Sequence, residues 1–127
     1  MLSLLLISAL SVDTVNSIRK QISNKQYNQA YQASNSMILQ QGMLDADSVL
    51  FLLRGSASVR IGKYLQGISD LSRFLRTTKN INPKDQKEAY LLRGTAYLKT
   101  GNLEDAKSDA ENSKDDSLVK LITKARF

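Results

Sequence analysis

Apolar residues recur at helical spacing along most of the chain, and one such stretch occurs twice. Residues 52–71 read LLRGSASVRIGKYLQGISDL, and residues 91–110 read LLRGTAYLKTGNLEDAKSDA. On both sides of a central glycine, Gly62 or Gly101, the apolar positions follow the period of one helix face. Because glycine marks a turn between periodic segments, each stretch predicts two helices joined by a short turn.

The second stretch repeats the first after 39 residues, counted from Leu52 to Leu91. Gly55 and Gly94 are one of the identical pairs, and each stands inside the first helix of its unit. A glycine there costs about 1 kcal/mol relative to alanine, so we expect packed helices to approach closely at this position. Self-similarity at a fixed period in helix–turn–helix units is typical of a helical solenoid.

Large and small residues keep fixed spacings in both units. An aromatic residue stands four positions before a glycine, as Phe51 does before Gly55, and the turn glycine follows seven positions later. This pattern resembles the tetratricopeptide (TPR) repeat family, although Arg54 and Arg93 stand where leucine is commoner. The resemblance implies an all-α fold, an α-solenoid of about three TPR helix–turn–helix units with a C-terminal capping helix.

The resemblance also implies boundaries for the units. We expect a degenerate first unit over residues 12–44, in which Lys25 takes the place of the turn glycine. Further units are expected over residues 48–81 and 87–115. Pro83 lies between these two units, where we expect it to end a lengthened helix or to sit in a longer loop.

Residues 116–127 are expected to form a capping helix or the start of a further unit. Leu118, Leu121, Ile122 and Ala125 are spaced as the apolar stripe of a helix that lies on the preceding unit. Because no capping glycine follows, we interpret the chain as the amino-terminal part of a longer protein.

Two charged pairs return with the repeat. Arg54 and Asp70 in one unit correspond to Arg93 and Asp109 in the next. Their spacing places each pair on the first and second helix of one unit, where we expect a structural salt bridge worth about 0.5–1 kcal/mol if partly exposed. Unrelated solvated charges are the alternative.

Helical solenoids bind along the groove that the first helix of each unit lines. In the best-known TPR mode, lysine, asparagine and arginine side chains clamp the terminal carboxylate of a cytosolic chaperone tail. The matching positions here are Val15, Arg19, Leu53, Glu88 and Leu92, and only Arg19 is cationic. We therefore predict no carboxylate-clamp binding.

We expect an apolar groove instead, with Leu53 and Leu92 facing it beside the packing stripe, and ordinary packing between helices is the alternative for each apolar residue. Burial of apolar surface gains about 25 cal/mol per Å² without demanding one sequence, which suits unfolded or extended apolar polypeptide. The candidate groove residues are Val15, Arg19, Leu53, Ser56, Val59, Leu92, Thr95 and Leu98. Gly55, Gly94 and the two charged pairs are predicted to be structural.

The composition argues against catalysis. The chain has no cysteine and no histidine, which excludes disulfides and thiolate zinc sites and removes the usual general base. Adjacent acids such as Asp115 and Asp116 fit turns and helix starts. We predict a protein that is not an enzyme and holds no cofactor or metal.

The charge does not indicate a nucleic-acid partner. The formal net charge is +6, but the 18 lysine and arginine residues are interspersed with acids, and no three are consecutive. Aromatic residues do not alternate with them as a base-stacking platform requires. We interpret the charge as a solvated basic surface and predict no nucleic-acid binding.

Residues 52–75 and 92–109 are similar to the first repeats of the endoplasmic-reticulum TPR co-chaperones that carry a J domain. The resemblance implies a luminal chaperone module that holds unfolded clients, which the J domain delivers to a luminal Hsp70. This chain lacks the His-Pro-Asp motif of a J domain, because it has no histidine. A TPR scaffold or adaptor for one defined partner is the alternative, and so is a cytoplasmic location.

Residues 1–11 predict a signal peptide. The run MLSLLLISAL is almost wholly apolar and too short to span a bilayer as a helix. Ala9 and Ser11 are small residues at positions that a signal peptidase reads. No lysine or arginine precedes the run, and an amino-terminal helix packed on the domain is the alternative.

We predict that expression in a secretory system removes residues 1–11, because the apolar run and the small residues after it form a cleavable signal. Mass spectrometry of the product should find a mature amino terminus near Val12. Ala9→Arg should block this cleavage, since a long charged side chain does not fit the peptidase. An intact Met1 on the wild-type product would remove the luminal assignment.

Overall fold

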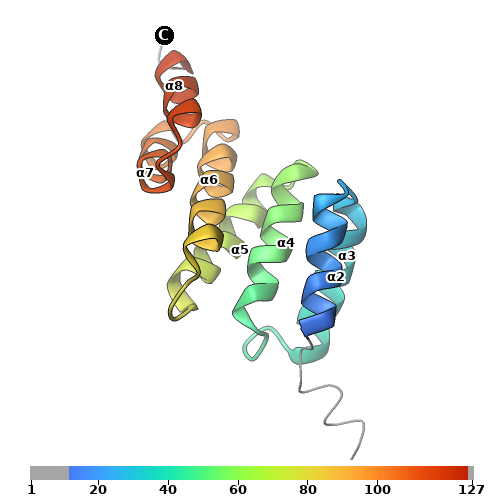
Figure 1. The fold of residues 1–127 in the computed structure, drawn as a ribbon. Helices are drawn as coiled ribbons and strands as arrows, with labels where there is room; N and C mark the ends of the chain where they lie inside the picture. The colour runs from blue at the N-terminus through green and yellow to red at the C-terminus, as the bar shows by residue number, and fades with distance from the viewer. Residues whose placement is uncertain (1–11, 126–127) are drawn as a thin grey trace, which may run out of the picture.

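The computed structural model describes residues 12–125, which form seven α-helices and no strand (Figure 1). The helices are α2 (Val12–Ser23), α3 (Tyr27–Gln41), α4 (Ser48–Arg60), α5 (Tyr64–Thr77), α6 (Pro83–Lys99), α7 (Leu103–Ser113) and α8 (Asp116–Ala125). The predicted all-α fold class is confirmed for this part of the chain. The predicted signal segment, residues 1–11, lies outside the described residues.

The helices are arranged as three hairpins in two layers, followed by α8. Helices α2, α4, α6 and α8 contact one another in succession and form what we call the first-helix layer. Helices α3, α5 and α7 form the second-helix layer, and within residues 12–125 each packs only against the helices before and after it in the chain. Figure 1 shows the hairpins α2–α3, α4–α5 and α6–α7 side by side along the molecule.

The three hairpins have turns of the same geometry. Lys25, Gly62 and Gly101 have backbone φ angles of 62°, 84° and 84°, in the left-handed region that follows many helices. In each turn the next residue donates its backbone N–H to a carbonyl five residues earlier, at 2.8–2.9 Å; these bonds run from Gln26 to Gln21, from Lys63 to Ser58 and from Asn102 to Tyr97. Lys25 therefore occupies the turn position that glycine holds in the other two hairpins.

A buried arginine of the second hairpin joins three helices. Arg54 on α4 donates from Nε and Nη2 to the two carboxylate oxygens of Asp70 on α5, at 2.8 Å each. Its Nη1 donates to Asn35 Oδ1 on α3 at 2.9 Å. The hydrogen bonds to Asp70 raise the pKa of the Arg54 guanidinium above its ordinary value, although burial opposes part of this effect.

The third hairpin repeats this arrangement. Arg93 on α6 donates to both carboxylate oxygens of Asp109 on α7, at 2.8 and 2.7 Å, and its Nη1 donates to Ser72 Oγ on α5 at 3.0 Å. Ser72 is the ninth residue of α5, as Asn35 is the ninth of α3. Both predicted salt bridges are confirmed, and each also reaches back to the preceding hairpin.

The predicted close approach at Gly55 and Gly94 is also confirmed. A Cβ atom on Gly55 would lie 2.8 Å from Leu71 Cγ, and one on Gly94 would lie 3.1 Å from Asp109 Cβ. The first of these distances is shorter than real Cβ contacts, so an alanine would push the two helices of the hairpin apart. Glycine is therefore the residue that lets the arginine and aspartate meet.

Apolar side chains fill the spaces between neighbouring helices in three clusters. One joins α3, α4, α5 and α6 around Phe51 and Leu71, and a second joins α2, α3 and α4 around Ile18 and Leu53. The third joins α7 and α8, with side chains of α6 packed against it. Each hairpin thus buries apolar surface against the next.

The start of the third hairpin differs from the prediction at Pro83. This residue neither ends α5, which stops at Thr77, nor lies in the loop, because it is the first residue of α6. Asn82 caps the helix by accepting a hydrogen bond from the Lys84 backbone N–H at 2.8 Å. A proline has no N–H to lose at this position and its φ angle already suits a helix.

The last helix follows the predicted stripe in part. Leu118 and Ile122 are buried against α7, but Leu121 is 56% exposed, so the prediction was wrong for Leu121. Helix α8 packs only on α6 and α7, which leaves the Leu121 face uncovered within the described residues. The side chain of Ala125 lies outside them.

We predict that Asp70→Ala destabilises the protein by about 3–5 kcal/mol, because the buried guanidinium of Arg54 loses its carboxylate. Asp109→Ala should cost less, since the Arg93 side chain is 19% exposed and that of Arg54 is 7% exposed. Urea unfolding followed by circular dichroism measures both changes.

The exposed Asp45→Ala is the control for this comparison, expected to change the free energy of unfolding by less than about 0.5 kcal/mol. A loss at Asp70 as small as that at Asp45 would contradict the structural role of the salt bridge.

Candidate functional site

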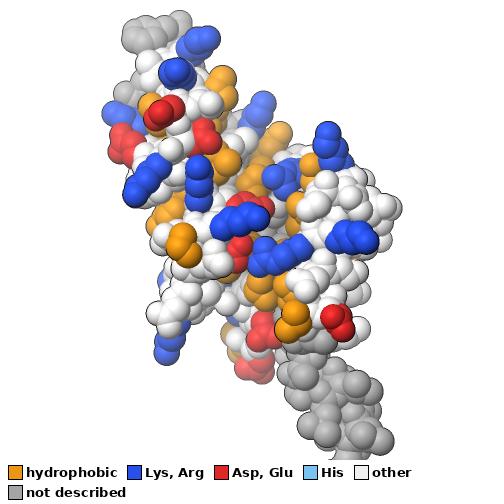
Figure 2. Space-filling view, viewed as in Figure 1, with side chains coloured by type: hydrophobic (Ala, Val, Ile, Leu, Met, Phe, Trp, Pro, Cys, Tyr) orange, Lys and Arg blue, Asp and Glu red, His pale blue; other side chains and the backbone are white. Residues whose placement is uncertain are grey.

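An open groove of about 400 Å³ crosses the first-helix layer between α2, α4 and α6. Arg19 and Ile22 line it from α2, Leu53 and Ser56 from α4, and Glu88 from α6. Figure 2 shows lysine and arginine side chains gathered over the middle of this face, with a few acidic ones among them. The groove is therefore built mainly by the first helices of three successive hairpins, as the sequence predicted for a binding surface, but charged and polar side chains line it together with apolar ones such as Ile22 and Leu52.

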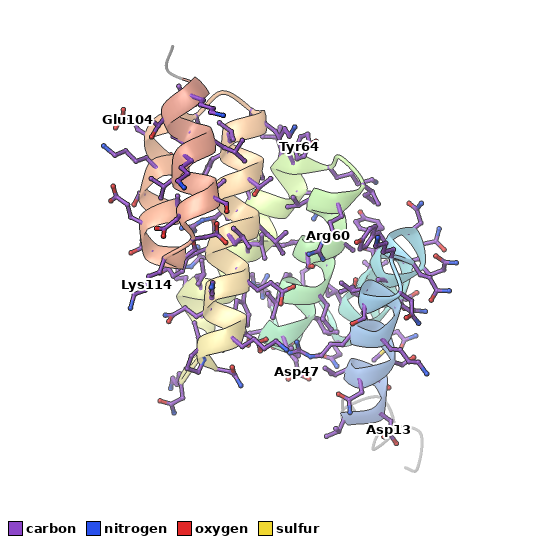
Figure 3. All side chains as sticks on the ribbon, turned by 45° about the horizontal axis from the view of Figure 1, so that its top comes forward. Asp13, Asp47, Arg60, Tyr64, Glu104 and Lys114 are labelled. Atoms are coloured by element: carbon purple, nitrogen blue, oxygen red, sulfur yellow. The ribbon has the colours of Figure 1, made fainter. Side chains whose placement is uncertain are left out.

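One wall of the groove carries linked polar side chains. Arg60 Nη1 donates to Ser56 Oγ at 3.1 Å, and Ser56 Oγ donates to Glu88 Oε1 at 3.4 Å. The central carbon of the Arg60 guanidinium lies 5.3 Å from the centre of the Tyr27 ring, within reach of a cation–π interaction. Arg60 thus lies between α4 and the α2–α3 hairpin (Figure 3), held by contacts on both sides.

A salt bridge spans the groove from α2 to α6. Arg19 donates from Nη1 and Nη2 to the two carboxylate oxygens of Asp85, at 3.2 and 3.1 Å. These two helices have no direct backbone contact in the described part of the chain, so the side chains alone bridge them. The one cation at a predicted clamp position is therefore engaged by a carboxylate of the chain itself.

The expectation that Leu53 and Leu92 face the groove is wrong for Leu92, and for Leu53 it holds only in position, because that side chain lines the groove but is buried. Leu53 is 2% exposed, packed with Ile18, Ala30 and Ala57, and contributes only to the floor of the groove. Leu92 is 7% exposed, belongs to the cluster around Phe51 and does not line the groove. Both leucines stabilise the stack of hairpins, because the helices that carry them are packed on several sides.

The other predicted groove residues are divided between the groove and the core. Arg19 and Ser56 line the groove, whereas four others do not. Val59 is buried in the core, Val15 and Leu98 are half-buried against apolar clusters, and the Thr95 hydroxyl donates to the Leu91 carbonyl at 2.8 Å.

The prediction included Arg19 but missed three other cations of the groove. Lys25, Arg60 and Lys84 line it together with Tyr27. Two local signals point to them, because Ser56 and Arg60, like Lys84 and Glu88, are four residues apart and so share one helix face. The proximity of the two helices is a long-range feature that these spacings do not reveal.

A second surface feature lies at the end of α3 and in the loop that follows it. Leu39, Met43 and Leu44 are large apolar residues that are 66%, 47% and 91% exposed. They are close in sequence and lie outside the groove. Exposed apolar side chains in a group are typical of interaction surfaces.

The acidic side chains give no sign of a metal centre in residues 12–125, where no three of them lie close enough together to hold an ion. Asp115 accepts a hydrogen bond from the Leu118 backbone N–H at 3.0 Å, and Asp116 begins α8. These acids stand at a helix start, as predicted.

Comparison with known proteins gives no identification, since no family model, curated protein or solved structure matches the chain. None of the helices in residues 12–125 combines the length and the apolar character needed to cross a membrane.

Proposed function

We propose that the chain is a non-catalytic binding module, a TPR-like solenoid that holds an extended polypeptide segment in the groove between α2, α4 and α6. The proposal rests on the position of the groove. The groove spans the first helices of three hairpins whose turns have the same geometry. Repeat proteins bind along the surface that successive units build together.

The chemistry of the groove supports a polypeptide ligand. Its volume falls within the range of known binding sites, and its wall offers a guanidinium, a hydroxyl and a carboxylate at Arg60, Ser56 and Glu88. An extended peptide exposes backbone N–H and C=O groups along its length, which such side chains can bind. Leu52 and Leu53 add a small apolar floor.

A defined partner is favoured over unfolded apolar clients as the ligand of this groove. Fixed polar and charged groups select particular side chains of a ligand, whereas holding many unfolded chains needs open apolar surface. The leucines expected to supply that surface, Leu53 and Leu92, are buried. We therefore place the scaffold or adaptor function first.

We predict that a photo-crosslinking amino acid at Ser23, an exposed residue that lines the groove, becomes linked to members of a library of unstructured peptides. The same amino acid at Ser69, exposed on α5 in the second-helix layer, is the matched control and should give little product. Mass spectrometry identifies the linked peptides. Equal linkage at the two positions, or none at either, would remove the groove as the binding site.

The second candidate is the chaperone function, with a different binding surface. The exposed group of Leu39, Met43 and Leu44 supports it, since apolar side chains can hold unfolded clients without a defined sequence. In this version the protein is a luminal co-chaperone module, and a luminal Hsp70 would be reached through a J domain that this chain does not contain.

For this second candidate we predict that the wild-type chain suppresses aggregation of several unrelated denatured proteins and that Leu44→Asp weakens the effect, because it places a charge in the apolar group. Leu65→Asp is the control, since Leu65 is 75% exposed on α5. Light scattering measures aggregation. Absence of suppression by the wild-type chain would leave the adaptor as the better proposal.

A further inference from the structure

The groove carries an excess of positive charge. Four of its lining side chains are cationic and one is acidic. The cations are Arg19, Lys25, Arg60 and Lys84, and the acid is Glu88. A groove lined mainly by one sign of charge attracts ligands of the opposite sign.

Three of these cations keep their charge available. Arg19 is paired with Asp85, but no salt bridge within residues 12–125 joins Lys25, Arg60 or Lys84 to a carboxylate. Lys25 and Lys84 are exposed, and so is Arg60. A ligand in the groove therefore meets three cations that form no direct salt bridge in the described part of the protein, with Glu88 as the one carboxylate among the lining residues.

Arg60 is positioned in advance for a ligand. The Tyr27 ring and the Ser56 hydroxyl fix the guanidinium, and the hydrogen bond to Ser56 uses only one of its five N–H donors. The remaining donors match the two oxygens of a carboxylate. Little side-chain entropy is lost when an arginine held in this way binds an anion.

We propose that the groove binds an acidic, extended segment of a partner protein, whose side-chain carboxylates pair with Lys25, Arg60 and Lys84. This inference rests on the proposed polypeptide-binding function and adds the chemical class of the ligand. The three cations come from the α2–α3 turn, the end of α4 and the start of α6, so they lie along the groove rather than at one point. Carboxylates spaced along an extended chain suit that distribution.

Side-chain carboxylates fit the groove better than a terminal carboxylate or a nucleic acid. A terminal carboxylate is a single anion at the end of a chain, and Arg19, the one cation at a predicted clamp position, is already bound to Asp85. A nucleic acid carries a phosphate at every nucleotide and would meet Glu88 among the residues that line the groove. A peptide can place a neutral residue opposite this acid.

The experiment measures binding of a fluorescent, amidated peptide of alternating glutamate and glycine by fluorescence anisotropy at low salt. The matched peptide has glutamine in place of glutamate. A second form of the glutamate peptide has a free carboxyl end, and an oligothymidylate of similar length serves as the nucleic-acid probe. We expect the amidated glutamate peptide to bind at least roughly tenfold more tightly than the glutamine peptide, with an affinity that falls as salt rises.

Three variants of the full chain locate the binding. The double variant Arg60→Glu with Lys84→Glu should bind the glutamate peptide roughly tenfold more weakly, because it reverses two groove charges. Lys79→Glu with Lys107→Glu changes the net charge equally at exposed positions that do not line the groove, and it should bind as the wild type does. Glu88→Gln should bind roughly threefold more tightly, since it removes the opposing carboxylate. Thermal unfolding confirms that each variant is folded.

Four results would overturn the inference. They are an equal loss in the two double variants, tighter groove-dependent binding of the oligothymidylate, a preference for the free carboxyl end, and equal binding of the glutamate and glutamine peptides. If the glutamine peptide still binds in the groove, the ligand class is wrong but the polypeptide-binding function stands. If no peptide binds and none becomes linked at Ser23, the acidic ligand class and the polypeptide-binding function are both wrong.

Discussion

The link from a buried arginine to two neighbouring helices determines the arrangement of this molecule. Arg54 and Arg93 each bind an aspartate within their own hairpin and a polar side chain of the hairpin before. Such a link needs close helices, which Gly55 and Gly94 allow. Because a buried guanidinium is costly unless all its partners are in place, the link favours one register between successive hairpins.

The first hairpin is joined differently, and this affects the groove. Counted eight residues back and eight residues forward from its turn at Lys25, the positions that match Arg54 and Asp70 are Ser17 and Ala33, so no buried ion pair ties α2 to α3. Helix α2 is instead held by the apolar cluster around Ile18 and by the bond from Arg19 to Asp85. Arg19, which helps to hold α2 in place, therefore also lines one side of the groove.

The repeated features could be predicted from the sequence, because hairpins, turns and salt bridges depend on residues within one unit. The exposure of Leu53 could not, since α4 packs against α2, α3, α5 and α6 and is buried from Leu50 to Val59. A prediction of exposure that assumes one solvent-exposed face is wrong for such a helix. The sequence analysis did not predict Arg60 and Lys84 as groove residues, because they belong to different hairpins and only the fold brings them together.

The most direct test is a titration of the ¹⁵N-labelled protein with the amidated glutamate peptide, followed by its backbone amide signals. We predict saturable shifts at the end of α4, at the start of α6 and in the α2–α3 turn, with α5 and α7 nearly unchanged. Shifts confined to α5 and α7, or to the loop after α3, would contradict a binding groove on the first-helix layer.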